Sequence, residues 1–399
     1  MNVFFKIFCR IYQTAFHMAL PVLPYREPER LPSVENIPAL LEKLGKKSAL
    51  MITDRGLRGA GVTAKMEHLM GESETKLTVY DATRPNPTTD NVDEALSIYK
   101  KEACDCLIAF GGGSSMDCAK AVGARIAHPH RSMASLKGDL RVFRRLPTLI
   151  AIPTTAGTGS EVTVTAVITD AEKHHKYTMN SFPLIPHYAV LDPEVTRTLP
   201  PSLTATTGMD ALTHAVEAYI GRSTSRETRR LSLEATKLVF ENVEKAYRDG
   251  NDMDARRNML HAAYKAGIAF SKSYVGYIHA VAHSLGGQYN VPHGLANTVL
   301  MPIVLEDYGA AIHRQLHELA IAAGIADEND SHEAAANRFI KEIRAMNARM
   351  GVPEKISGIK EEDIPAMAKH AAREGNPLYP VPVLMDAAQL EKYYRMVKE

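Results

Sequence analysis

The sequence predicts an α/β N-terminal domain built on a parallel β-sheet, followed by an all-α C-terminal domain. Its length of 399 residues exceeds the usual size of a single hydrophobic core, which favours two domains. Short apolar runs alternate with amphipathic stretches between Glu35 and Asp192. Beyond residue 200 the apolar residues recur almost wholly at helical spacing.

The first half of the chain has the strand–helix–strand rhythm of βαβ units, in which successive strands lie parallel. Ligands then bind at the carboxyl ends of the strands. The expected strands are Ala49–Thr53, Leu77–Tyr80, Cys106–Phe110 and Thr148–Ile152, and the expected helices are Ile37–Leu44, Val62–Met70, Val92–Glu102 and Cys118–Ala127.

A domain boundary is expected near Thr198–Ser202, where two consecutive prolines interrupt the pattern and Ser202 could cap a following helix. We therefore divide the chain into an N-terminal extension (1–30), an α/β domain (31–200) and a helical domain (201–399). The helices expected in the last part are Ala211–Ile220, Thr228–Tyr247, Asp254–Ser271, Val275–Leu285, Ala310–Ala323, Glu333–Met350 and Ala387–Val397.

Composition and charge exclude several classes of partner. The chain carries 47 basic and 46 acidic side chains, so no global field gathers nucleic acid, and a small-molecule partner is expected. Four cysteines are too few for a disulfide framework. This count favours a reducing, cytoplasmic location.

The N-terminal segment is apolar enough to raise the alternative of a signal peptide or membrane anchor. Lys6, Arg10 and Gln13 interrupt the apolar run, however, and no convincing small-residue cleavage site follows. We expect an amphipathic helix here and no stable membrane anchor.

A glycine-rich loop, Gly111–Asp117, follows the strand expected at Cys106–Phe110 and leads directly into a helix. Because Gly111, Gly112 and Gly113 have no side chains, the backbone can approach a diphosphate, and the helix N-terminus supplies free N–H groups. The loop is neither a Walker motif nor a GxGxxG fingerprint. A tight turn that binds no ligand is the alternative.

A second loop, Pro153–Glu161, follows the strand expected at Thr148–Ile152 and offers hydroxyl and backbone donors for phosphate, ribose or nicotinamide. Asp54 ends an earlier strand, where a carboxylate can accept hydrogen bonds from the adenosine ribose and repel a 2′-phosphate. This position favours NAD over NADP, although Arg55 and Arg58 lie nearby. A helix or turn cap is the alternative role of Asp54.

Histidine and aspartate residues recur at one-turn spacing in the helical half. Asp210 and His214 are four residues apart, His279 and His283 repeat that spacing, and His293 follows. Three imidazoles and one carboxylate from this constellation would suit Fe²⁺ or Zn²⁺. Such an ion acts as a Lewis acid that stabilises an alkoxide before hydride leaves carbon.

From about residue 30 to its C-terminus the chain resembles the iron-containing (group III) alcohol dehydrogenases. The segments that carry the resemblance are Arg84–Thr88, Gly111–Asp117, Pro153–Glu161, Gly208–His214 and His279–His293. The resemblance implies an enzyme that transfers hydride between a nicotinamide dinucleotide and an alcohol or aldehyde. It also implies a dinucleotide-binding domain over 31–200, a metal-binding domain over 201–399, a cleft between them, and a homodimer.

Carried onto matching positions, the resemblance implies one divalent ion, Fe²⁺ before Zn²⁺, held by Asp210, His214, His279 and His293. His283 would lie near the ion and assist proton transfer or substrate positioning without binding it. The implied dinucleotide contacts are Asp54, Asn86, Gly113, Ser114, Asp117, Thr154, Thr155, Thr158 and Lys176. For Lys176, a solvated hairpin lysine beside His174 and His175 is the alternative.

The chain departs from the family in its first thirty residues, in Arg26–Pro32, at Thr165, and in Ser271–Gly276, where Lys272 and Tyr274 replace the residues common in the family. Phe270, Val275 and Ile278 are expected to form apolar walls, and Tyr274 to add bulk. An uncharged short or medium-chain primary alcohol or its aldehyde is therefore the expected substrate, with reduction of the aldehyde the easier direction at neutral pH. An inward-pointing Lys272 would instead favour an acidic substrate.

Two other activities remain as alternatives. A polyol or hydroxy-acid dehydrogenase, or a dehydroquinate-synthase-like enzyme, would use the same scaffold with a different pocket. A metal-dependent phosphohydrolase would also need His and Asp ligands, but the adjacent His-Asp pair is absent and two glycine loops would go unexplained.

Overall fold

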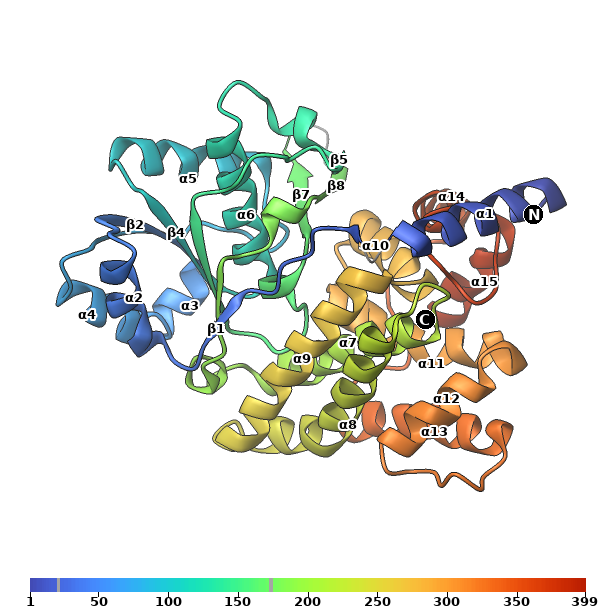
Figure 1. The fold of residues 1–399 in the computed structure, drawn as a ribbon. Coiled ribbons are helices and arrows are strands. Elements are labelled where there is room, and N and C mark those ends of the chain that lie inside the picture. Colours follow the sequence, from blue (N-terminus) through green and yellow to red (C-terminus); the bar gives the residue numbers. More distant parts are fainter. Residues whose placement is uncertain (20–21, 172–174) are drawn as a thin grey trace. The chain divides into compact units, whose positions relative to one another are not determined.

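The computed structural model describes residues 1–19, 22–171 and 175–399. The chain divides into two compact units (Figure 1). One is Pro24–Leu199, and the other combines Met1–Leu23 with Pro200–Glu399. The N-terminal helix thus belongs to the same unit as the C-terminal half.

A six-stranded, wholly parallel sheet forms the centre of the Pro24–Leu199 unit, in the order β1-β9-β6-β4-β2-β3. The parallel sheet expected from the sequence is confirmed. Its strands are β1 (Glu29–Leu31), β2 (Ser48–Ile52), β3 (Lys76–Tyr80), β4 (Cys106–Gly111), β6 (Thr148–Pro153) and β9 (Tyr188–Val190). A second, smaller sheet contains β5 (Gly138–Asp139), β7 (Thr165–Asp170) and β8 (His175–Asn180).

Helices cover both faces of the parallel sheet because alternate side chains of each strand point to opposite sides. Leu50 and Ile52 pack in one cluster with α5 (Thr89–Lys101) and α6 (Gly113–Ala127). Ala49 and Met51 pack in another cluster, with α2 (Ile37–Lys43) and α4 (Ala64–Gly71). The short α3 (Arg55–Gly59) follows β2. The central strands β2, β4 and β6 are therefore buried along nearly their whole length.

The other unit is all-helical, as the sequence predicts. Ala215, Ala235 and Ala266 meet between α7, α8 and α9, and their small side chains let these three helices pack closely. The helices are α1 (Val3–Ala19), α7 (Pro201–Ile220), α8 (Arg226–Arg248), α9 (Met253–Ser273), α10 (Tyr277–Tyr289), α11 (His293–Tyr308), α12 (His313–Ala322), α13 (His332–Arg349), α14 (Ile364–Gly375) and α15 (Ala387–Val397).

Three details differ from expectation. Ser202 does not cap α7, which begins at Pro201 without a side-chain cap, because proline is itself well suited to the first helical position. Helix α11 is buried around nearly its whole circumference and contains Pro302, so it lacks the amphipathic period that reveals a helix. Helix α14 was also not expected from the sequence. Its proline lies in the first turn, as the proline of α7 does, and so does not interrupt the helix.

All four cysteines are buried and free. Within the described residues, no helix combines the length and apolarity that a bilayer crossing requires.

Gly208 in α7 gives a test of this packing. An added Cβ would lie 2.5 Å from Val243 Cγ2 and 2.9 Å from Met259 Cε, so we expect Gly208→Ala to destabilise the protein by about 1–3 kcal/mol. Gly287, exposed in α10, has no heavy atom within 4 Å of the same added Cβ. Gly287→Ala should therefore stabilise by roughly 0.5–1 kcal/mol. Urea unfolding midpoints measure both, and equal shifts would contradict the packing described.

Candidate functional site

The glycine loop between β4 and α6 packs directly against the second loop. A Cβ on Gly111 would lie 2.5 Å from the hydroxyl oxygen of Ser115, and one on Gly113 would lie 3.0 Å from Thr158 Cγ2. Gly112 approaches Thr155 in the same way, at 3.3 Å. Because β4 pairs with β6, both loops leave the same edge of the sheet. A side chain at Gly111 would therefore clash, and one at Gly112 or Gly113 would force Thr155 or Thr158 to shift.

The N-terminus of α6 keeps donors available. No side chain among the described residues caps it, so the first N–H groups of the helix are not satisfied in that way. The hydroxyl of Thr155 is buried and has no hydrogen-bond partner among the described residues. Thr154 beside it is also buried. These donors have the chemistry that a diphosphate or a nicotinamide amide needs.

Two side chains of α6 bind the end of the second loop and the residues that follow it. Lys120 is fully buried, and its Nζ donates to Ser160 Oγ at 3.0 Å, to Thr163 Oγ1 at 2.9 Å and to the Thr165 carbonyl at 2.8 Å. Asp117 accepts from Ser160 Oγ at 2.8 Å and from the Val167 N–H at 3.0 Å. Burial lowers the pKa of Lys120 to about 8 and raises that of Asp117.

Sequence reasoning missed Lys120, although its i, i+3 spacing from Asp117 on the helix was a readable signal. Asp117 was expected to contact the dinucleotide. Its oxygens are occupied by Ser160 and Val167, so its contact with a dinucleotide stays a prediction.

The remaining expected dinucleotide residues lie in the same unit. Asp54 caps α3, its carboxylate accepting from the Leu57 N–H at 2.9 Å. Asn86 has a left-handed backbone (φ 58°), and its N–H donates to Ser114 Oγ at 3.3 Å. Lys176 lies in β8, and burial lowers its pKa. His174, proposed beside Lys176, lies outside the described residues.

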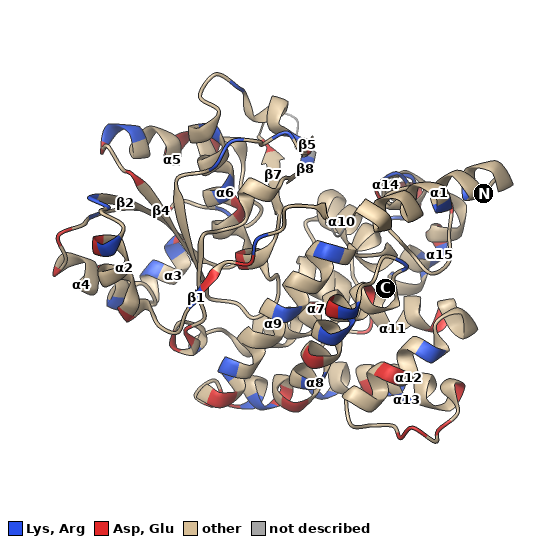
Figure 2. Ribbon diagram, viewed as in Figure 1, with Lys and Arg blue, Asp and Glu red and all other residues tan. Residues whose placement is uncertain are grey.

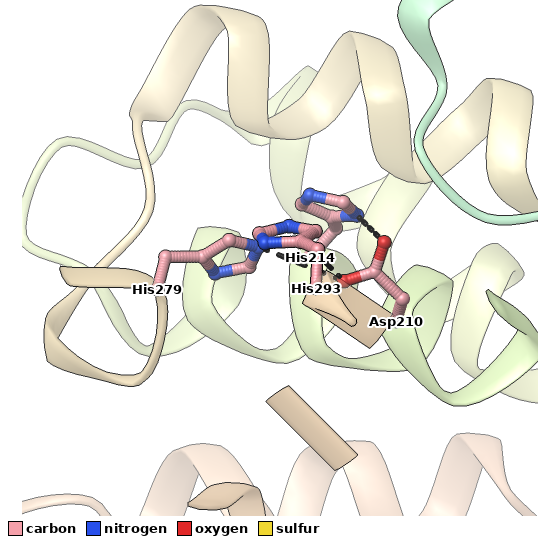
Figure 3. Close-up of side chains that lie close together, drawn as sticks. All are labelled: Asp210, His214, His279 and His293. Carbon is pink, nitrogen blue, oxygen red and sulfur yellow. Dashed lines mark ion pairs between the residues drawn. The ribbon is translucent and has the colours of Figure 1, made fainter. Parts of the chain in front are cut away.

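Asp210, His214, His279 and His293 converge in the helical unit (Figure 3). One potential ligand atom from each lies within 4.8 Å of the others. Two come from one face of α7, one from the first turn of α10 and one from the first residue of α11. Asp210 Oδ1 lies 3.6 Å from His293 Nε2 and 3.9 Å from His279 Nε2.

The donor set fits a divalent ion. Nε2 of His279 is buried and has no hydrogen-bond partner among the described residues. Burial, and then the neighbouring histidines, hold the pKa of His279 well below its ordinary value. This favours the neutral ring, which presents a lone pair, as metal binding requires. Asn297 supports the carboxylate by donating to Asp210 Oδ1 at 2.7 Å.

Glu217, which the sequence analysis did not single out, joins α7 to the start of α10. Its carboxylate accepts from the Gly276 and Ile278 N–H groups, each at 2.8 Å, and lies 2.6 Å from Nδ1 of His279. Burial raises the pKa of Glu217 to about 7. With Nδ1 directed at this carboxylate, Nε2 of His279 faces the ligand cluster, as in carboxylate–histidine–metal arrangements.

His283 lies one turn beyond His279, outside the cluster of four. Its ring centroid lies 5.1 Å from that of His293, and its Nδ1 lies 2.5 Å from Oε1 of Glu374. The Tyr379 hydroxyl donates to the same oxygen at 2.7 Å. His283 is thus oriented by groups of α14 and the segment after it, and about a third of its side chain is exposed.

Two family models match this chain. The one described as iron-containing alcohol dehydrogenase matches residues 31–193, and the one described as the C-terminal part of the Fe-containing alcohol dehydrogenase family matches residues 204–397. The chain belongs to the iron-containing alcohol dehydrogenase family.

The enzyme has similar relatives over most of its length. It is 37% identical over 337 residues to 1,3-propanediol dehydrogenase of Klebsiella pneumoniae, covering 84% of this chain and 87% of that protein. It is 35% identical over 366 residues to NAD-dependent methanol dehydrogenase of Bacillus methanolicus, covering 90% and 95%. A crystal structure of 1,3-propanediol oxidoreductase matches with a TM-score of 0.89 at 34% identity, covering 94% and 99%.

The enzyme is therefore an oxidoreductase acting on alcohols or aldehydes, with a nicotinamide dinucleotide and a divalent metal as its cofactors. This confirms the family, the fold class and the reaction class expected from the sequence.

Glu217→Gln tests the joining role of Glu217. The amide keeps the shape of the side chain but removes the charge that orients His279, so we expect metal affinity to fall roughly 10–100-fold. Chelator competition with Fe²⁺ or Zn²⁺ measures it. Glu234→Gln, which alters an ion pair with Lys265 on the surface of α8, is the matched control. Unchanged metal affinity in Glu217→Gln would contradict the assignment.

Proposed function

We propose that the enzyme interconverts short, uncharged primary alcohols and their aldehydes with NAD(H), using one divalent ion, Fe²⁺ before Zn²⁺. The observation that carries the proposal is the convergence of Asp210 with three imidazoles, in which Nε2 of His279 is buried without a hydrogen-bond partner among the described residues. Relatives named for 1,3-propanediol, methanol and lactaldehyde support a small substrate.

Asp210, His214, His279 and His293 would hold the ion, which supplies Lewis-acid stabilisation of the negative charge developing on the substrate oxygen. The carboxylate of Asp210 offsets part of the positive charge in this buried site. Phe270 stacks on His214, with ring centroids 4.2 Å apart, and so keeps one face of the ligand ring away from water.

His283 is proposed as the group that exchanges a proton with the substrate oxygen. Its Nδ1 faces Glu374, which fixes the ring orientation and leaves Nε2 for the exchange. A partly exposed side chain can pass the proton on to solvent.

A pair of histidine variants tests these two roles. His279→Ala should lose both metal and activity, because it removes a buried ligand. His283→Ala should keep one metal per chain while turnover falls roughly 10²–10⁴-fold, the usual contribution of a positioned proton donor. Elemental analysis of protein purified without oxygen, together with steady-state kinetics, separates the roles. Loss of metal in His283→Ala would make His283 a ligand.

NAD is proposed as the preferred dinucleotide because Asp54 would meet a 2′-phosphate with like charge. Asp54 also caps α3, so Asp54→Gly would change two things at once. Asp54→Asn keeps a good capping oxygen and removes the charge. We expect this variant to improve kcat/KM with NADP relative to NAD roughly tenfold, equivalent to about 1.4 kcal/mol. Equal efficiency of the parent with both dinucleotides would refute this proposal.

The structure favours the uncharged substrate over an acidic one. The Lys272 ammonium contacts both carboxylate oxygens of Glu227 on α8, at 2.9 and 2.8 Å, so recognition of an acidic substrate by Lys272 would have to disrupt this pair. Ile278 and Phe270 were both expected as apolar walls of the substrate pocket. Ile278 is fully buried, whereas Phe270 stacks on His214 in the ligand cluster.

A substrate panel follows from this arrangement. With NADH at neutral pH we expect kcat/KM to be highest for butyraldehyde and other short aldehydes, and low for a semialdehyde carrying a carboxylate. Lys272→Ala should change this order little. A parental preference for glycerol would move the assignment to polyols, and a semialdehyde preference abolished by Lys272→Ala would move it to hydroxy acids.

We further propose a cytoplasmic location and a homodimer. Four buried free thiols support a reducing compartment. Light scattering of the purified enzyme tests the dimer.

A further inference from the structure

Helix α1 packs on the enzyme through its polar side and turns its apolar side to solvent, the reverse of an ordinary amphipathic helix on a protein surface. Its fully buried side chains are Cys9 and Gln13, whereas large apolar side chains face solvent: Phe4 is 80% exposed, Ile11 64% and Met18 69%. These three recur every seven residues and so lie on one face, and Ile7 and Phe8 on the same face are about half exposed. The apolar face of the helix is thus its outer face.

Specific polar contacts hold α1 in this orientation. The Arg10 guanidinium donates to the carbonyls of Val381 and Pro382, at 2.7 and 2.8 Å. The Gln13 amide donates to the Tyr379 carbonyl at 2.7 Å. Phe16 adds an edge contact to Tyr274, with centroids 5.0 Å apart. The outward apolar face is therefore a consequence of defined contacts on the inner face.

The charges along α1 are all positive. The first acidic residue of the chain is Glu27, and α1 itself carries Lys6 and Arg10 one turn apart. Both cations line an open groove of about 690 Å³, whose other walls are mostly apolar. The apolar walls are Ile7, Ile11, Met18, Pro382, Val383 and Leu384. A groove that combines cations with apolar walls has the chemistry to take an anionic headgroup and the start of an acyl chain.

A second copy of the chain fits this face less well. A coiled-coil pair uses a narrow seam of two positions per heptad, but the exposed apolar face of α1 also includes Val3, Phe5 and Tyr12. Exposed phenylalanines beside lysine and arginine are instead typical of helices that lie in the plane of a membrane interface. Because α1 contains no acidic side chain, a negatively charged lipid surface is favoured as its partner.

We propose that α1 is an interfacial helix that binds the enzyme reversibly to bilayers containing anionic phospholipids. Phe4, Phe8 and Ile11 enter the boundary between headgroups and acyl chains, while the exposed Lys6 faces the phosphates and Arg10 keeps the helix attached to the enzyme. The helix lies on the membrane and does not cross it. This role is independent of the substrate and cofactor proposed above.

The chain contains no tryptophan, so one introduced residue reports on this contact. In full-length Ile11→Trp, we expect a blue shift of emission on adding vesicles of phosphatidylcholine with phosphatidylglycerol, and a smaller shift with phosphatidylcholine alone or at high salt. Phe143→Trp is the matched control, because Phe143 is 67% exposed but lies in the other unit. Equal shifts in the two variants, or none in Ile11→Trp, would overturn the proposal.

Vesicle flotation tests the same face of α1 after its exposed apolar side chains have been removed. Phe4→Ser/Phe8→Ser/Ile11→Ser and, separately, Lys6→Glu should bind anionic vesicles at least roughly tenfold more weakly than the parent. Leu140→Ser/Phe143→Ser removes comparable exposed apolar surface elsewhere and should bind as the parent does. Aldehyde reduction, unchanged in all variants, reports correct folding. If the α1 variant instead lowers the mass measured by light scattering without changing vesicle binding, a second copy covers α1 and the proposal fails.

Discussion

The buried carboxylate of Glu217 is the interaction on which the helical unit depends most directly. It satisfies two backbone N–H groups at the start of α10 and contacts His279, so a single side chain determines where α10 begins and how its first histidine points. The fit is close, because a Cβ on Gly276 would lie 2.6 Å from the Glu217 carboxylate. A buried carboxylate is costly unless its hydrogen bonds are made, and here these bonds are also the ones that shape the ligand cluster.

The two loops that follow β4 and β6 are fixed by a buried ionisable group of the opposite charge. Lys120 is a buried ammonium that donates to the Ser160 hydroxyl at the end of the second loop and to Thr163 and Thr165 just beyond it. Both halves of the enzyme thus keep an ionisable group away from water to fix a loop or a helix end. Lysine, arginine, aspartate and glutamate residues are distributed over both units (Figure 2).

Much of this fold was predictable because the signals were local. Alternation of apolar runs located β2, β3, β4 and β6 to within a residue or two, and four-residue spacing placed Asp210 beside His214. Helix α11 escaped because a helix buried on all sides has no periodic pattern. Glu217, Asn297 and Glu374 escaped for a different reason. Their roles depend on contacts between helices distant in sequence, which spacing within one helix does not reveal.

The distribution of the ligand cluster over three helices has a consequence for how the enzyme matures. Asp210 and His214 come from α7, whereas His293 is the first residue of α11, where a Cβ on Gly294 would already touch the Thr206 carbonyl of α7 at 2.7 Å. The site therefore does not exist until most of the C-terminal half has been synthesised and its helices have packed. A divalent ion would therefore bind to helices that have already packed, so its supply would determine how much of the folded protein becomes active.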